Sequence, residues 1–216
     1  SKEEALLDIT ADDLVDSAKE ALSIAQLIGD RVVIVATSNG GALALYLAES
    51  ISNLAALILY SPNIEIYDPT AKLLDDPWGL EIAKKVKGSN YHIANMPDNR
   101  KPYWYHKYRL ESLPQLQAFV SRAMTPINFK TVDAPVFLSY YYKNEEEQDK
   151  VVSVPAMLRM YDQLSTPSSQ KQKQAFPKAG DHILASPLVS NDVEGVYRAT
   201  YSFLKEVVNL EIKTPQ

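Results

Sequence analysis

The sequence predicts an α/β fold: a mostly parallel sheet with helices on both faces, plus an inserted helical cap. Two apolar runs, Val32–Ala36 and Ala55–Tyr60, lack the polar alternation of a half-exposed strand. Such runs are typical of strands buried on both faces of a parallel sheet. Helical patterns precede and separate the two runs, as crossover connections between parallel strands require. A long aromatic stretch rich in proline then interrupts this alternation.

The first helix is predicted over residues 10–28. Thr10 and Asp13 stand at the positions of a capping box, with an acidic side chain close to the helix start. Apolar residues recur at helical spacing: Leu14, Ala18, Ala21, Leu22, Ala25 and Ile28. Gly29 is expected to end the helix, because glycine enters the left-handed conformation at little cost.

A second helix is predicted over residues 39–52, directly after the first strand, and it opens with Gly40 and Gly41. The second strand, over residues 55–60, ends at a Ser-Pro-Asn sequence. Helix and strand therefore alternate with short links, which indicates a sheet covered on both faces.

Residues 64–132 do not continue this pattern, and they are too long for a simple connection. Short helical patterns occur near residues 79–87 and 113–123. We interpret the stretch as an inserted helical cap, which divides the chain into a core of residues 1–63 and 133–216 and a cap of residues 64–132.

Regular alternation resumes after the cap. Strands are predicted over residues 135–141 and 172–176, and helices over residues 153–164 and 191–208. The last helix is expected to begin with a capping box at Asn191.

Composition restricts the function classes. The 216 residues are 46% hydrophobic and 23% charged, and the formal net charge of −5 argues against a nucleic-acid partner. There is no cysteine, which excludes disulfides, thiolate metal sites and a cysteine nucleophile. No stretch has the roughly 20 apolar residues of a membrane span. A cytoplasmic location is favoured, although lack of cysteine does not fix the compartment, and the oligomeric state is not indicated.

Ser38 is the candidate nucleophile. It lies between a predicted buried strand and a glycine-opened helix, in the sequence Ala36-Thr37-Ser38-Asn39-Gly40. This resembles the G-x-S-x-G nucleophile elbow of the α/β-hydrolases, with alanine at the first small position. Two other interpretations stay open at this point: Ser38 as a helix N-cap, or the turn as a phosphate-binding site.

The resemblance extends to the partners of the serine. His182 lies between the last predicted strand and the last helix, where the family carries its catalytic base. Asp149 follows the preceding strand and stands before Val151-Val152, the usual setting of the family's acid. The chain order Ser, Asp, His is also that of the family. The rival acids are three neighbouring glutamates and one earlier aspartate: Glu145, Glu146, Glu147 and Asp68.

The resemblance covers about residues 10–64 and 134–208, and it implies a carboxylesterase-like or lipase-like serine hydrolase without metal or organic cofactor. The backbone N–H of Asn39 would bind the oxyanion. The family's earlier strands and its second oxyanion loop are not found in this sequence. We therefore expect a natural protein with a further N-terminal part, with a reduced, inactive relative as the alternative. The substrate would be a small acyl compound.

The cap is rich in aromatic residues, of which Trp78, Tyr103 and Trp104 are candidates for an apolar substrate pocket. The alternative is that they pack the cap. His92 and His106 are expected to be structural or surface residues. Two other functions remain open: a peptidase, thioesterase or acyltransferase on the same scaffold, and a non-catalytic binding protein that kept the fold.

Overall fold

The structure is a computed structural model that describes residues 4–211 of the chain. The described chain forms two compact units. The smaller unit contains residues 4–17 and Pro69–Arg122, and the sheet unit contains Ala18–Asp68 and residues 123–211. All three predicted catalytic residues belong to the sheet unit.

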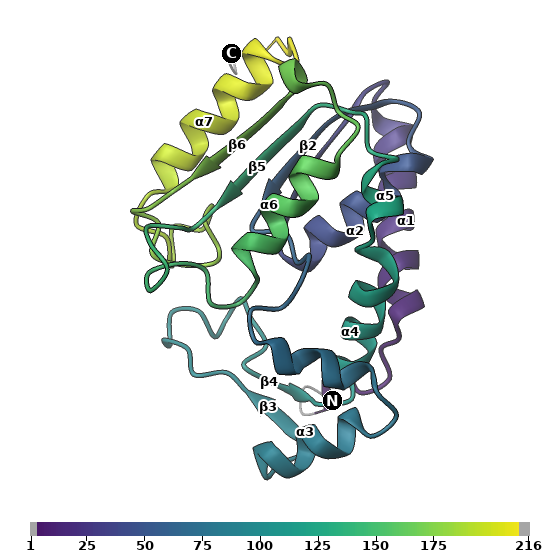
Figure 1. Cartoon of the computed structure of the whole chain (residues 1–216), viewed down its shortest axis with the longest axis vertical. Coiled ribbons are helices and arrows are strands. Elements are labelled where there is room, and N and C mark those ends of the chain that lie inside the picture. Colours follow the sequence, from purple (N-terminus) through teal and green to yellow (C-terminus); the bar gives the residue numbers. More distant parts are fainter. Residues whose placement is uncertain (1–3, 212–216) are drawn as a thin grey trace. The chain divides into compact units, whose positions relative to one another are not determined.

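The sheet unit is built on four parallel strands (Figure 1). They are β1 (Val32–Thr37), β2 (Leu54–Tyr60), β5 (Val136–Tyr140) and β6 (Lys171–Ala175), and they lie side by side in that order. Every pairing between neighbours is parallel, which confirms the predicted sheet. Consequently the carboxyl ends of all four strands lie along one edge of the sheet.

Helices cover both faces of this sheet, as predicted (Figure 1). Along β2, Leu57 and Leu59 point into one core cluster, and Ile58 points into the other. The first cluster includes residues of α2 and α6, and the second includes residues of α7. These helices are α2 (Asn39–Leu47, continued by the 3-10 turn Ala48–Ser50), α6 (Val154–Gln163) and α7 (Val193–Glu206).

The prediction that β1 is buried on both faces is wrong, whereas for β2 it is confirmed. All of β2 after Leu54 is buried, but β1 is only partly covered and 58% of Val35 is exposed. The physical reason is position in the sheet. Among the described strands, β1 pairs with β2 alone and forms the edge of the sheet.

Helix α1 (Ala11–Ile28) begins as predicted. The Asp13 carboxylate accepts a hydrogen bond from the Thr10 N–H at 2.8 Å, and the Thr10 hydroxyl accepts one from the Asp13 N–H at 3.1 Å. This reciprocal pair confirms the capping box. The predicted apolar stripe is wrong at Ala21 and Ile28, which are exposed, and its other members are only partly buried.

The capping box predicted at Asn191 is wrong. Helix α7 starts at Val193 with Asp192 at the N-cap, and no side chain closes the cap. In contrast, Ser153 at the start of α6 accepts a hydrogen bond from the Ala156 N–H, with a proline in the first turn. The remaining elements of this unit are α5 (Pro126–Phe129) and a 3-10 turn (Ser168–Gln170).

The smaller unit contains the two short helices that the sequence predicts near residues 79–87 and 113–123, together with a strand pair that it does not predict. The elements are a 3-10 helix (Pro69–Asp75), α3 (Gly79–Lys87), β3 (Tyr91–Ile93), β4 (Lys107–Arg109) and α4 (Ser112–Ala123). Strands β3 and β4 are antiparallel and only three residues long, which is too short for alternation to be recognisable in the sequence.

An ion-pair network ties the smaller unit together. The Arg109 guanidinium contacts the carboxylates of Glu4 at 2.7 Å and Glu111 at 2.8 Å. The hydrogen bond from Arg109 lowers the pKa of Glu111 to about 2.

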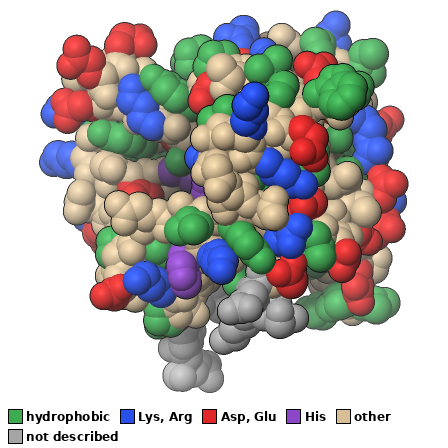
Figure 2. Space-filling model, turned by 90° about the horizontal axis from the view of Figure 1, so that it is seen from below, with side chains coloured by type: hydrophobic (Ala, Val, Ile, Leu, Met, Phe, Trp, Pro, Cys, Tyr) green, Lys and Arg blue, Asp and Glu red, His purple; other side chains and the backbone are tan. Residues whose placement is uncertain are grey.

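On the face shown in Figure 2, hydrophobic side chains are interspersed with charged ones and do not form one continuous patch. None of the helices within residues 4–211 has the length and apolar character of a membrane span.

Gly41 marks the tightest approach of α2 to its surroundings. A Cβ atom there would lie 2.7 Å from the Pro62 Cβ, whereas at Gly40 it would lie 3.7 Å from the Ala36 Cβ, an ordinary contact. We expect Gly41→Ala to lower the free energy of unfolding, because overpacking costs about 1–3 kcal/mol and exceeds the helix-propensity gain of about 1 kcal/mol. Gly40→Ala is the matched control, expected to be neutral or stabilising. Urea unfolding of both variants tests this, and equal midpoints would contradict it.

Candidate active site

Ser38 occupies a strained turn between β1 and α2. Its backbone has φ 56° and ψ −121°, a conformation that residues with a Cβ rarely adopt. Strain of this kind costs about 1–3 kcal/mol and persists only where the surroundings impose it. The turn matches the sharp strand-to-helix elbow that the sequence predicts.

The Ser38 hydroxyl does not cap the helix. Ser38 stands at the N-cap position of α2, but its side chain makes no capping hydrogen bond. The N-cap interpretation is therefore wrong, and the hydroxyl is not committed to a structural role at the helix start. Asn39 is the first residue of α2, so its backbone N–H has no acceptor within the helix.

Asp149 is almost completely buried at the end of the loop after β5, with 1% of its surface exposed. One carboxylate oxygen, Oδ1, accepts hydrogen bonds from the backbone N–H groups of Val151 at 2.9 Å and Val152 at 3.1 Å. The apolar pair after the acid therefore has a second role. Its backbone holds the carboxylate in place and leaves Oδ2 for another partner.

That partner is His182, in the loop between β6 and α7. The His182 Nδ1 lies 2.7 Å from Asp149 Oδ2, and the His182 side chain is 10% exposed. Gly180, two residues earlier, has φ 71°, the left-handed conformation that lets the chain turn sharply before the histidine. An ionised carboxylate at Nδ1 places the ring proton there and leaves Nε2 as a proton acceptor.

All three residues follow strands at the same edge of the sheet. Ser38 comes directly after β1, and the loops after β5 and β6 carry Asp149 and His182. Within residues 4–211 the structure joins the histidine to the aspartate, and it shows no hydrogen bond between His182 and the Ser38 hydroxyl. In enzymes without substrate this last link is often long and tightens only when substrate binds.

The rival acids do not share this environment. Glu145, Glu146 and Glu147 are exposed, as expected for a solvated loop, and Glu147 instead pairs with the ammonium of Lys143 at 2.7 Å. Asp68 is exposed as well. Burial and the histidine contact thus single out Asp149.

The Asp149 carboxylate is expected to make the free energy of unfolding depend on pH. Burial alone would raise the pKa of its carboxyl, but the hydrogen bond from His182 and the two backbone N–H groups lower it below the ordinary value of 3.8. A depressed folded-state pKa adds stability above the ordinary value, and this stability is lost as pH falls through the folded-state pKa. The difference in unfolding free energy between the protein and Asp149→Asn should therefore be larger at pH 6 than at pH 3. Urea titrations at both pH values measure it, and an unchanged difference would contradict the expectation.

The other two histidines lie in the smaller unit. The His92 ring stacks on Tyr108 with centroids 4.9 Å apart, and burial lowers the pKa of its imidazole, with a contribution from Lys87. His106 is exposed and lines a pocket. Throughout residues 4–211, no group of three or more His, Cys, Asp and Glu side chains could hold a metal ion.

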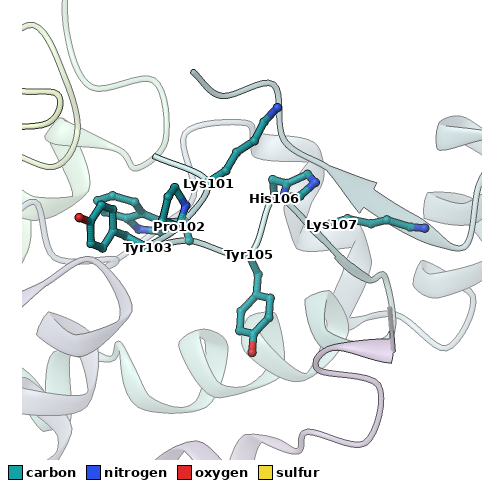
Figure 3. Close-up of a pocket in the computed structure, with 7 residues that line it drawn as sticks. Lys101, Pro102, Tyr103, Tyr105, His106 and Lys107 are labelled. Carbon is teal, nitrogen blue, oxygen red and sulfur yellow. The ribbon is translucent and has the colours of Figure 1, made fainter. Parts of the chain in front are cut away.

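The aromatic candidates belong to the smaller unit too. A pocket of about 520 Å³ is lined by the continuous segment Lys101, Pro102, Tyr103, Trp104, Tyr105, His106 and Lys107 (Figure 3). Tyr103 is 71% exposed and Trp78 is 73% exposed, whereas Trp104 is half-buried and meets the Tyr103 ring edge-to-face. Lys101 and Lys107, which were not predicted as site residues, add positive charge to the pocket wall.

Sequence reasoning also missed Asn63. This residue follows β2 at the same sheet edge and is 3% exposed. Its backbone N–H donates to the Ser38 carbonyl at 2.9 Å, and its side-chain Nδ2 donates to Asn39 Oδ1 at 2.8 Å. The sequence carried no signal for it, because Asn63 meets the serine turn only where β2 pairs with β1.

Solved structures with the same fold include lipolytic and ester-cleaving enzymes. A structure described with the metagenome-derived lipolytic enzymes LipS and LipT superimposes with a TM-score of 0.69 at 16% identity, covering 92% of this chain and 75% of that one. The monoacylglycerol lipase of Paleococcus ferrophilus gives 0.63 at 16% identity, with 88% and 74% covered. A thermostable carboxyl esterase from Bacillus coagulans gives 0.63 at 11% identity, with 90% and 72% covered.

No family model matches the sequence, and no curated protein matches it. At these identities the likeness establishes the fold, which confirms the α/β-hydrolase architecture that the sequence resembles.

Proposed function

We propose that this chain, which has the α/β-hydrolase fold, is a serine hydrolase that cleaves an ester or related acyl bond with Ser38, His182 and Asp149. The observation that supports this most is the 2.7 Å contact between His182 Nδ1 and the buried Asp149 carboxylate. A buried carboxylate is costly unless it is paired, and this pairing gives the imidazole one defined tautomer. The strained, uncapped serine at the same sheet edge supplies the matching nucleophile.

In the proposed reaction His182 Nε2 takes the proton of the Ser38 hydroxyl as its oxygen attacks the substrate carbonyl. The resulting imidazolium is stabilised by Asp149 and gives the proton to the leaving group, which departs and leaves an acyl-serine. Water then attacks the acyl group with His182 again as base, releasing the acid and restoring the serine. No cofactor takes part in these steps.

The Asn39 N–H is the proposed oxyanion donor. It starts α2, so the positive end of the helix dipole adds to the field at the developing negative charge. Removing one such donor typically costs about 10²–10³ in turnover.

Labelling by a fluorophosphonate probe tests the proposal, because the probe forms a stable bond with an activated serine. We expect the protein to be labelled and Ser38→Ala to be unlabelled. Absence of labelling would favour a non-catalytic binding protein. A panel of p-nitrophenyl esters, peptides and thioesters then identifies the bond type, and preference for a peptide or thioester would replace the esterase assignment.

We also propose that Trp78, Tyr103 and Trp104 bind the apolar part of the substrate. The exposed rings of the first two and the pocket of Figure 3 support this. Trp104→Ala should raise KM for a p-nitrophenyl octanoate several-fold while KM for the acetate changes little, because only the longer chain needs apolar contacts. Equal effects on both esters would contradict a role in acyl binding, and Tyr197→Ala, at an exposed tyrosine of α7, is the control.

A further inference from the structure

A short segment after β2, residues 61–63, contacts the turn at Ser38, which follows the neighbouring strand β1. The Ser61 N–H donates to the Ser139 carbonyl at 2.8 Å, which attaches the segment to the end of β5. Pro62 packs so closely on Gly41 that no Cβ would fit there. These two contacts fix the position of the next residue, Asn63, which is nearly fully buried and contacts Ser38 and Asn39.

Asn63 makes one contact with the Ser38–Asn39 peptide unit and one with the side chain of Asn39. Its backbone N–H donates to the Ser38 carbonyl at 2.9 Å, and its Nδ2 donates to the Asn39 side chain at 2.8 Å. The Ser38 carbonyl and the Asn39 N–H belong to one planar group, so fixing the oxygen also fixes the direction of the N–H on the opposite side. The Asn39 N–H is the proposed oxyanion donor.

The serine turn needs such support. Ser38 holds a φ of 56°, a conformation that relaxes unless surrounding contacts oppose it. The N–H groups of Gly41 and Ala42 hold the Ser38 carbonyl from within the helix start, at 3.0 and 3.3 Å. Two contacts come from outside the turn: the Ser38 N–H donates to the Tyr60 carbonyl at the end of β2 at 3.1 Å, and Asn63 reaches the Ser38 carbonyl from the segment after β2.

We propose that Asn63 is a positioning residue: its backbone N–H holds the Ser38 carbonyl and its side chain holds the Asn39 side chain, so that the Asn39 N–H points at the oxyanion. This inference rests on the proposed function. Misdirecting one preorganised donor weakens only the transition state, because the charge that the donor meets develops there. The effect is therefore expected in kcat and not in KM.

Four variants test this through steady-state ester hydrolysis. Asn63→Ala keeps the backbone N–H and removes only the side-chain link, and Asn39→Ala removes the same link from its other end. We expect each to lower kcat about 10-fold with KM within about 2-fold, and the double variant to be no worse than either single one, since all three lose one interaction. Asn128→Ala is the control, because its Nδ2 donates to the Ala123 carbonyl at 2.7 Å, in a contact that involves none of the proposed site residues.

A purely structural role predicts a different outcome. Asn63→Ala would then lower the melting temperature as Asn128→Ala does and leave kcat unchanged, and this result would overturn the proposal. Additive losses in the double variant would also overturn it. If Asn63→Ala does not fold, Asn39→Ala alone decides, by its kcat.

Hydrogen exchange separates this inference from the proposed function. Exchange over residues 36–42 should be faster in Asn63→Ala than in Asn128→Ala, whether or not the protein is catalytic. A protein that reacts with neither fluorophosphonate nor any ester would overturn the proposed function and the catalytic part of this inference. Equal exchange in the two variants would show that Asn63 does not hold the turn.

Discussion

Ester turnover by Ser38→Ala is expected to fall by at least about 10³-fold, because the variant has no nucleophile to form the acyl intermediate. The fold should be unaffected. The Ser38 side chain makes no capping hydrogen bond, and alanine removes a single oxygen. Initial rates on a p-nitrophenyl ester, measured beside a melting curve, check both parts of the expectation.

Ser23→Ala is the matched control for this experiment. The Ser23 hydroxyl donates to the Lys19 carbonyl on the exposed surface of α1, so the substitution removes an oxygen where no chemistry is proposed. We expect full activity from it. Substantial residual turnover in a purified, folded Ser38→Ala protein would show that another group attacks the ester, and the assignment of the nucleophile would be wrong.

Asp149→Asn is expected to lower kcat by roughly 10³–10⁴-fold. The amide is nearly isosteric, but it carries no charge to stabilise the imidazolium and presents the wrong hydrogen-bonding group to His182 Nδ1. The KM should change little, because Asp149 is buried and contacts His182, not the substrate. Stopped-flow or steady-state rates across a pH series measure the loss.

The neighbouring glutamates supply the controls for the acid. Glu145→Gln, Glu146→Gln and Glu147→Gln alter exposed side chains of the same loop, and each should retain activity within about 2-fold, as expected for surface substitutions. A large loss of activity in one of these variants, together with an active Asp149→Asn protein, would identify that glutamate as the catalytic acid. Loss in every variant would indicate that the loop itself is disturbed.

Periodicity was sufficient to predict most elements of the fold. The cap helix predicted over residues 79–87 coincides with α3, and the buried run after residue 54 coincides with β2. Local patterns succeed there because the spacing of apolar side chains in a helix or a fully buried strand follows which of its faces are buried. They fail for β1, whose apolar residues are alike whether or not a second neighbour pairs with the strand.

The site was predictable as residue types at strand ends, but not as a set of contacts. A turn between strand and helix identified Ser38, and element order identified His182. The sequence favoured Asp149 over Glu145 by its place before Val151-Val152, and its burial, which a polar loop sequence does not reveal, supports that choice. Asn63 could not be recognised, because its contacts with the serine turn depend on β1 and β2 being adjacent and in register.

The sequence by itself determined the order of strands and helices, the lack of cysteine chemistry, and which side chains stand where parallel strands end. Only the tertiary structure decided that the Asp149 carboxylate meets the His182 ring at 2.7 Å and that Asn63 contacts Ser38 and Asn39. The physical reason is that both features arise between segments far apart in the chain. The pairing of strands and the burial of loops create them, and no local run of residues encodes either.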